Sequence, residues 1–182
     1  MMRIIGDACI ASTKWVELRE KQYETQDGRS GEWSYVSRIN SRRAVVMVPW
    51  TRDSRSLVYI EQYRVPLEQA VFELPAGLVD PGESLADCAV RELLEETGYH
   101  GTVQSISGPV CPSPGLAAEL MHIVTMEVEE EPSGSQDLQG AEQILVHRLA
   151  PGAVQTLHQH WQETQALIDA KLYMHVLGLA GQ

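Results

Sequence analysis

Three glutamates stand close together in the sequence, at a spacing that a helix would bring onto one side. Glu92, Glu95 and Glu96 are three and four residues apart, and residues at those separations are neighbours on a helix surface. Like charges placed this way destabilise a helix by about 0.2–0.5 kcal/mol per pair. A hard divalent cation would offset the repulsion, because Mg²⁺ prefers carboxylate oxygens and retains several waters. An ordinary exposed acidic face is the alternative, since charged helix faces are common.

Residues that begin and end helices stand on both sides of these glutamates. Ser84 is a favourable N-cap, and Asp87 follows three residues later, as in a capping box. Gly98 stands where a left-handed C-terminal cap is expected. Between the caps, apolar residues recur every four positions and are predicted to face the core. They are Leu85, Ala89 and Leu93, with Ala86, Val90 and Leu94.

The glutamates belong to a longer spaced series that begins before the helix. Its defined positions are Gly77, Glu83, Arg91, Glu92, Leu93, Glu95, Glu96, Gly98 and Tyr99. In order and spacing the series resembles the Nudix box, G-x5-E-x7-R-E-U-x-E-E-x-G-U with U apolar, at all nine positions. Tyr99 is a mild departure, because an aliphatic residue is more usual there. From its sequence the chain is identified as a member of the Nudix hydrolase superfamily.

The flanking sequences resemble the ADP-ribose and ADP-sugar pyrophosphatase branch of that superfamily. ELPAGLVDPGE at the start of the series and EQYR at residues 61–64 are similar to that branch, as is Pro114. KWVEL at Trp15, EWSYVSR at Trp33 and the C-terminal IDAKLYMHVLGLA also resemble it. The resemblance implies an α/β Nudix fold, with a mixed β-sheet sandwiched between helices and an N-terminal antiparallel β arm.

By the same resemblance, the box glutamates hold Mg²⁺ ions that bridge to a substrate diphosphate, and Mn²⁺ is an expected substitute. Glu92 and Glu96 are the first ligands implied, with Glu95 as the third and the Ala76 carbonyl as a backbone ligand. Bound metal would neutralise the diphosphate and the charge that develops on the attacked phosphorus. Glu83 is expected to support the junction of loop and helix or to bind a further metal. Stabilisation of the helix dipole is the alternative for Glu83.

Two catalytic roles remain, orientation of the glutamates and activation of a water. Arg91 is expected to orient the box glutamates rather than to contact substrate. Glu142 ends an acidic loop before a predicted strand, and it is the first choice for the general base. An ordinary exposed loop glutamate is the alternative, and Glu119 and Glu95 compete for the role. A correctly placed base typically contributes about 10²–10⁴-fold to the rate.

Candidate substrate-binding residues lie outside the box. Arg64 follows a predicted buried strand and could fork onto a phosphate, with a surface ion pair as the alternative. Arg38 is a similar candidate, and Glu119 is counted with this group. Trp15 and Trp33 offer flat faces for a purine, and stacking is worth roughly 1–3 kcal/mol per base. Ordinary packing within an N-terminal sheet is the alternative for both tryptophans.

The rest of the chain reads mainly as strands, up to its C-terminal part. Strands are expected at residues 14–23, 32–39, 44–50, 57–63, 71–74, 102–110, 120–128 and 144–149. Pro and Gly predict a loop around residues 75–82, and residues 129–141 are expected to form a mobile acidic loop. One helical pattern covers residues 151–179. Trp50, Phe72 and Trp161 are expected in the core.

Composition limits the class of partner and the compartment. The 182 residues include 14 Lys+Arg and 25 Asp+Glu, a net charge of −11, which argues against non-specific nucleic-acid binding. A run of about 18 apolar residues is absent from the sequence, so we expect no membrane-spanning helix. The N-terminus lacks the apolar region of a signal peptide. Three widely spaced cysteines fit a reducing compartment, and we expect a cytoplasmic protein without nucleic-acid or membrane partners.

Two segments are expected, a β arm over residues 1–42 and a Nudix hydrolase domain over residues 43–182. In the resembling branch the arm is exchanged between protomers, which implies a homodimer with residues 10–40 as the dimer arm. The expected reaction is Mg²⁺-dependent cleavage of ADP-ribose, or a related nucleoside diphosphate sugar, into a nucleoside monophosphate and a sugar phosphate. The alternatives are another sugar nucleotide such as GDP-mannose, or a non-catalytic sensor of ADP-ribose.

Overall fold

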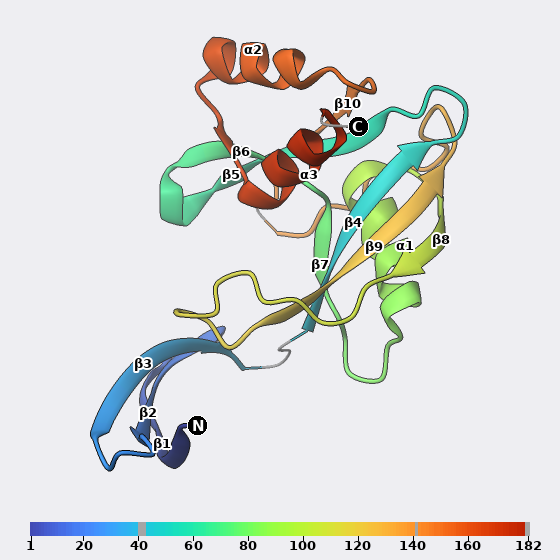
Figure 1. The fold of residues 1–182 in the computed structure, drawn as a ribbon. Coiled ribbons are helices and arrows are strands. Elements are labelled where there is room, and N and C mark those ends of the chain that lie inside the picture. Colours follow the sequence, from blue (N-terminus) through green and yellow to red (C-terminus); the bar gives the residue numbers. More distant parts are fainter. Residues whose placement is uncertain (40–42, 141, 181–182) are drawn as a thin grey trace.

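In the computed structural model, which describes residues 1–39, 43–140 and 142–180, a three-stranded arm precedes a larger mixed sheet flanked by helices (Figure 1). The elements follow in the order β1 (Arg3–Ser12), β2 (Val16–Glu24), β3 (Ser30–Arg38), β4 (Arg43–Thr51), β5 (Leu57–Arg64), the 3-10 turn η1 (Val65–Leu67), β6 (Gln69–Glu73), β7 (Ala76–Leu78), α1 (Leu85–Thr97), β8 (Gly101–Ile106), β9 (Leu120–Val128), β10 (Ile144–Leu149), α2 (Val154–Thr164), β11 (Leu167–Ile168) and α3 (Ala170–Ala180).

The larger sheet is mixed, with the strand order β11-β6-β5-β4-β9-β8. β4 runs parallel to β9, and β6 runs parallel to β11, whereas the other pairs are antiparallel. Off this path, β10 pairs with β5 and the short β7 pairs with β4. The mixed sheet between helices, preceded by an antiparallel arm, is the predicted α/β fold class.

The core lies on both faces of β4, because successive strand side chains point to opposite faces. Val45 and Met47 belong to the cluster that α1 covers. Val46 and Val48 belong to the cluster that α2 and α3 cover. An apolar run buried on both faces is typical of a central strand. The strand thus joins two separate cores, and the helices of Figure 1 lie on opposite sides of the sheet.

Several boundaries differ from the prediction. The arm holds a further strand, β1, which pairs with β2, and β7 lies within the predicted loop. The predicted helix over residues 151–179 is interrupted, because Gln165 adopts a left-handed conformation that ends α2 before β11 begins. The prediction of Trp161 as a core residue is wrong: Val154 and Leu157 are the buried residues of α2, and Trp161 is 42% exposed. Val90 is likewise exposed, because the buried stripe of α1 runs through Cys88 instead.

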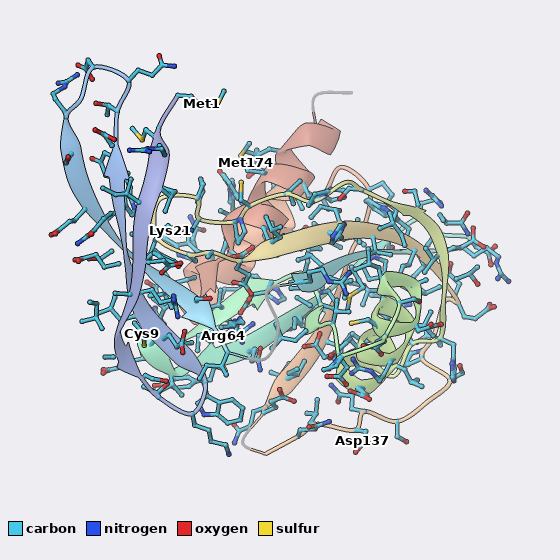
Figure 2. All side chains as sticks on the ribbon, turned by 90° about the horizontal axis from the view of Figure 1, so that it is seen from below. Met1, Cys9, Lys21, Arg64, Asp137 and Met174 are labelled. Carbon is cyan, nitrogen blue, oxygen red and sulfur yellow. The ribbon has the colours of Figure 1, made fainter. Side chains whose placement is uncertain are left out.

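The arm pairs with a loop of its own chain. The Val36 N–H donates to the Leu116 carbonyl at 2.8 Å, and the Ala118 N–H donates to the Val36 carbonyl at 2.9 Å. The indole of Trp33 donates to the Gly115 carbonyl at 3.0 Å. Figure 2 shows the arm, marked by Cys9 and Lys21, standing beside the rest of the chain with side chains on both faces. The expected boundary between the arm and the Nudix domain follows residue 42. It adjoins residues 40–42, which lie outside the described residues.

Two observations bear on the expected environment of the chain. None of the helices in the described part of the chain is long and apolar enough to cross a bilayer. Cys9, Cys88 and Cys111 are all free thiols.

Candidate active site

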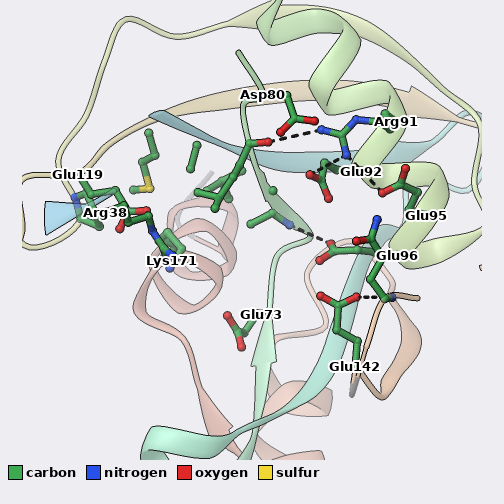
Figure 3. Close-up of a pocket in the computed structure, with 18 of the residues that line it drawn as sticks. Arg38, Glu73, Asp80, Arg91, Glu92, Glu95, Glu96, Glu119, Glu142 and Lys171 are labelled. Atoms are coloured by element: carbon green, nitrogen blue, oxygen red, sulfur yellow. Dashed lines mark hydrogen bonds and ion pairs between the residues drawn. The ribbon is translucent and has the colours of Figure 1, made fainter. Parts of the chain in front are cut away.

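A cleft with a volume of about 520 Å³ gathers residues from the arm, β7, α1, α3, three loops and further strands of the large sheet. Most of the residues singled out from the sequence line it (Figure 3). They are Arg38, Arg64, Ala76, Arg91, Glu92, Glu95, Glu96, Glu119 and Glu142. Glu83 does not line the cleft itself, but it forms an ion pair with Arg91, which does line it.

Helix α1 forms as its caps predict. The Ser84 hydroxyl accepts a hydrogen bond from the Asp87 N–H at 3.1 Å. Gly98 adopts φ 74°, and its N–H donates to the Leu94 carbonyl at 2.8 Å. A left-handed residue at this position ends a helix at little steric cost only when it is glycine. The helix therefore spans Glu92, Glu95 and Glu96, and it places Glu92 and Glu96 against Gly77 and Ala76 of β7.

Glu92 lies directly against the backbone at Gly77. A Cβ atom added to Gly77 would lie 2.0 Å from the Glu92 Cδ, a distance that real contacts do not reach. Burial raises the pKa of Glu92, and its ion pair with Arg91 opposes this shift. The glycine of the box is thus required here for close approach, because its missing side chain makes room for a carboxylate.

Glu96 is the most buried glutamate of the box, with 8% of its surface exposed. Its Oε2 accepts a hydrogen bond from the Ala76 N–H at 3.0 Å. Burial raises the pKa of Glu96 to about 8; the Ala76 hydrogen bond opposes the shift, and the charges of Glu92 and Glu142 add to it. Burial therefore disfavours the charged form of Glu96, because water solvates a carboxylate poorly at this place in the cleft.

Arg91 joins three glutamates. Its guanidinium makes a two-point contact with Glu83, at 2.8 and 2.9 Å, and approaches Glu92 at 2.9 Å and Glu95 at 3.3 Å. The Arg91 contact lowers the pKa of Glu83 to about 2, with a further contribution from the Asp80 N–H. Glu83 also accepts that N–H at 3.1 Å, so it ties the loop before α1 to the helix.

The acidic loop of residues 129–142 docks on the C-terminal end of α1. The Asp137 N–H donates to the Glu95 carbonyl at 2.9 Å, the Gln136 amide donates to the Glu96 carbonyl at 2.6 Å, and the Gly134 N–H donates to the Gly98 carbonyl at 2.9 Å. Carbonyls at a helix C-terminus lack partners within the helix, and the loop supplies them. These contacts do not fit the expected mobile loop. Ala141, at its end, lies outside the described residues.

Glu142 reaches the cleft from the end of this loop. It is exposed, and its Oε2 accepts the Gln139 N–H at 3.0 Å. In Figure 3 its carboxylate lies beside Glu96, in keeping with the contribution of its charge to the Glu96 pKa. The geometry therefore brings a loop carboxylate to the buried end of the box.

The two candidate arginines outside the box are already ion-paired. Arg64 makes a two-point contact with Glu73, at 2.6 and 2.9 Å. Arg38 donates to Glu119 at 2.9 Å, which links the arm to the loop before β9. Both arginines line the cleft of their own chain, so neither has to come from a second protomer.

The two candidate tryptophans lie outside this cleft. Trp15 is 66% exposed, with the Lys14 ammonium 4.5 Å from its ring centre. Trp33 is 53% exposed and lines a separate cavity of about 280 Å³ between the arm and the loop at Pro114. Within a single chain neither ring faces the glutamates, so their expected role in purine stacking stays a prediction.

The donor set fits a hard divalent cation in its chemistry, because the converging ligands are carboxylate oxygens held in a poorly solvated cleft. Across residues 1–39, 43–140 and 142–180, no group of three or more His, Cys, Asp and Glu side chains is already arranged around a metal-sized position. The physical reason lies in Arg91, which draws Glu92 and Glu95 toward its guanidinium. Binding of a cation requires Glu92 and Glu95 to turn from Arg91, whereas Glu96 is held by the Ala76 N–H.

Four further charged residues line the cleft, and the sequence analysis assigned none of them a role. They are Glu73, Asp80, Asp137 and Lys171. Glu73 belongs to the ELPA segment, and its side chain contacts Arg64 although the β5–β6 register pairs Glu73 with Ile60 and Arg64 with Gln69. Lys171 was missed because the sequence predicts one helical pattern over residues 151–179, whereas the structure begins a new helix at Ala170. No signal in the sequence places Asp137, whose position depends on how the loop docks.

Comparison with known proteins agrees with this geometry. A model of the NUDIX domain matches residues 40–170. The chain is 31% identical over 140 residues to an ADP-sugar pyrophosphatase of Mus musculus, a match that covers 72% of this chain and 64% of the mouse protein. It is 32% identical over 124 residues to an ADP-ribose pyrophosphatase of Saccharomyces cerevisiae, covering 64% and 54% of the two chains. The chain therefore spans less than two thirds of these two relatives.

A solved structure supports the fold in the same way. The crystal structure of an ADP compounds hydrolase superposes with a TM-score of 0.70 at 24% identity, covering 87% of this chain and 83% of that one. The family match spans most of the chain, and the box glutamates converge in the cleft. The chain belongs to the NUDIX family.

Proposed function

We propose that this chain hydrolyses the diphosphate bond of ADP-ribose, or of a related nucleoside diphosphate sugar, in a reaction that depends on Mg²⁺. The observation that carries the proposal is the complete set of box glutamates, Glu92, Glu95 and Glu96, lining one cleft with Arg38 and Arg64. The names of the mouse and yeast relatives support an ADP-linked sugar as the substrate. Mn²⁺ is the expected substitute, and a reducing cytoplasm is the expected compartment.

The residues of the chain divide the work of binding and orientation. Mg²⁺ held by Glu92, Glu95 and Glu96, with the Ala76 carbonyl, would supply neutralisation of the diphosphate charge. Glu83 fixes the Arg91 guanidinium, and Arg91 orients Glu92 and Glu95 until a cation binds them. Arg64 can turn part of its guanidinium to a phosphate oxygen while Glu73 keeps it oriented.

Glu142 is the general base that the geometry favours. Glu119 and Glu95 are each held by an arginine, Arg38 and Arg91, so taking up a proton there would cost an ion pair. Among the described residues, the Glu142 carboxylate accepts one hydrogen bond, from the Gln139 N–H. Its carboxylate can accept a proton from a water whose oxygen attacks phosphorus, while the phosphorus–oxygen bond to the leaving monophosphate breaks.

A panel of nucleotides tests the proposal. ADP-ribose, ADP-glucose, GDP-mannose, UDP-glucose and 8-oxo-dGTP are incubated with Mg²⁺, and release of phosphate monoesters is measured. We expect ADP-ribose to give the highest kcat/KM, and a preference for GDP-mannose would support the alternative substrate. Glu96→Gln should reduce Mg²⁺-dependent turnover steeply; unchanged turnover would refute the metal role of Glu96. Binding of ADP-ribose without turnover of any compound would identify a sensor instead.

A further inference from the structure

One cation in the cleft has no role in the proposal so far. Lys171 lines the cleft from the first turn of α3, on the side away from the box glutamates (Figure 3). Its side chain is 28% exposed, so its ammonium is partly shielded from water. A cleft in which glutamates and aspartates predominate has few cations to offer an anionic substrate, and each one has a large electrostatic effect.

Lys171 is held in position by its neighbours. The Asp169 Oδ2 accepts from the Lys171 Nζ at 2.7 Å, and the Asp169 Oδ1 accepts from the Lys171 backbone N–H at 2.8 Å. The Asp169 N–H donates to the Phe72 carbonyl at 2.9 Å, which fixes this corner to the large sheet. The ammonium thus has a defined position, and among the described residues Asp169 takes one of its three hydrogens.

Arg64 reaches the same corner from the other side. Its partner Glu73 is adjacent to Phe72 in β6. The hydrogen bonds to Glu73 raise the pKa of Arg64, and the charges of Glu96 and Asp169 contribute to the shift. Asp169 is hydrogen-bonded to the carbonyl of Phe72, the neighbour of Glu73, so the two ion pairs are anchored at adjacent residues of β6. The end of β6 gathers one guanidinium and one ammonium, each with its own carboxylate.

We propose that Lys171 binds the substrate diphosphate together with Arg64, so that the two cations hold its oxygens on the side opposite the box glutamates. This inference rests on the proposed function, because it concerns the same substrate. The paired carboxylates Glu73 and Asp169 position the two cations. Substrate oxygens would then complete the hydrogen bonding of an ammonium that is already oriented, at a low entropic cost.

The test measures binding without turnover. The probe is the hydrolysis-resistant α,β-methylene analogue of ADP-ribose, titrated calorimetrically in Mg²⁺ into wild type, Lys171→Met and Lys171→Arg. Loss of one charge-assisted contact should weaken binding by about tenfold, and Lys171→Arg should recover most of it. Arg52→Met is the matched control, because it removes one positive charge at a surface ion pair with Glu127. The control should bind like wild type.

Two further measurements separate contact from indirect effects. In Lys171→Met the Asp169 carboxylate loses its partner and could itself repel the substrate. The double variant Lys171→Met/Asp169→Asn removes that charge: binding should stay weak, and recovery to the wild-type Kd would overturn the proposal. The affinity of wild type should also fall more steeply with added salt than that of Lys171→Met or Lys171→Gln, a difference that a purely structural role would not produce.

The kinetic outcome distinguishes this inference from the proposed function. Lys171→Met should raise KM for the best nucleotide by about tenfold with kcat little changed, as loss of ground-state binding predicts. If wild type cleaves no nucleotide of the panel, the proposed function fails. If wild type does not bind the analogue, or if wild type and Lys171→Met bind it equally, the role of Lys171 fails.

Discussion

A methyl group at position 77 would occupy the space that the Glu92 carboxylate fills. We therefore expect Gly77→Ala to displace Glu92 while the fold persists. Displacement of a reacting group by about 1 Å can cost on the order of 10²-fold in rate, and kcat/KM should fall by that order. Gly108→Ala is the control, because a Cβ there meets nothing within 4 Å. A fully active Gly77→Ala variant with an unchanged Mg²⁺ requirement would contradict this reading of the contact.

The choice of general base can be tested by a pair of isosteric variants. Glu142→Gln should lower kcat by about 10²-fold or more, because the variant cannot accept a proton from water. Glu119→Gln should cost less than tenfold, since Glu119 is already held by Arg38. The measurement is kcat at saturating substrate and Mg²⁺. If Glu119→Gln proves the more damaging of the two, the assignment of the base must be reversed.

Among the elements, α1 was predictable from the sequence in almost every detail. Its caps, its span and the common direction of Glu92, Glu95 and Glu96 follow from local spacing, which a helix translates directly into geometry. The C-terminal part was not predictable in the same way. Residues on either side of Gln165 keep a helical apolar pattern, and the interruption depends on a left-handed residue and on pairing of β11 with a distant strand.

Because the break between α2 and α3 was not predicted, Lys171 was not recognised as a residue of the cleft. β11 pairs with β6 through Ile168 and Phe72, and this contact between distant segments sets the start of α3 at the cleft. A continuous helix would have carried Lys171 elsewhere. The docked loop of residues 129–142 was missed for a similar reason, because its partners are main-chain carbonyls of α1. Every residue type has a main-chain carbonyl, so the sequence does not indicate which carbonyls will accept hydrogen bonds from the loop.

Helix α3 contains a histidine that should link stability to pH. Burial lowers the pKa of His175 below its usual 6.5, and its Nε2 lacks a hydrogen-bond partner in the described structure. Because the folded-state pKa lies below the unfolded one, the contribution of His175 to stability is present above pH 6.5 and is lost as the pH falls. Urea unfolding at pH 8 and pH 5.5 should show a smaller acid loss in His175→Leu than in wild type. The exposed His100→Gln should behave like wild type; an equal acid loss in all three proteins would refute the prediction.

For the whole molecule, the arm argues for association between chains. Ile4, Ile10, Trp15 and Trp33 are all more than half exposed on the arm, and exposed apolar groups of this kind mark contact surfaces. We predict a homodimer, with a mass in sedimentation equilibrium of twice the 20.2 kDa of the chain. In that dimer the tryptophans of one arm are expected at the cleft of the partner. A monomeric mass with undiminished activity would exclude exchange of the arm.

The region that matches the family begins at residue 40 and ends at residue 170. Arg38 lies just before that region and Lys171 just after it, and both line the cleft. The box carboxylates are thus encoded in the shared region, whereas two of the cations come from its flanks. Part of the proposed recognition surface is therefore encoded outside the family region, so substitutions in these flanks can alter substrate preference while the box residues are inherited unchanged.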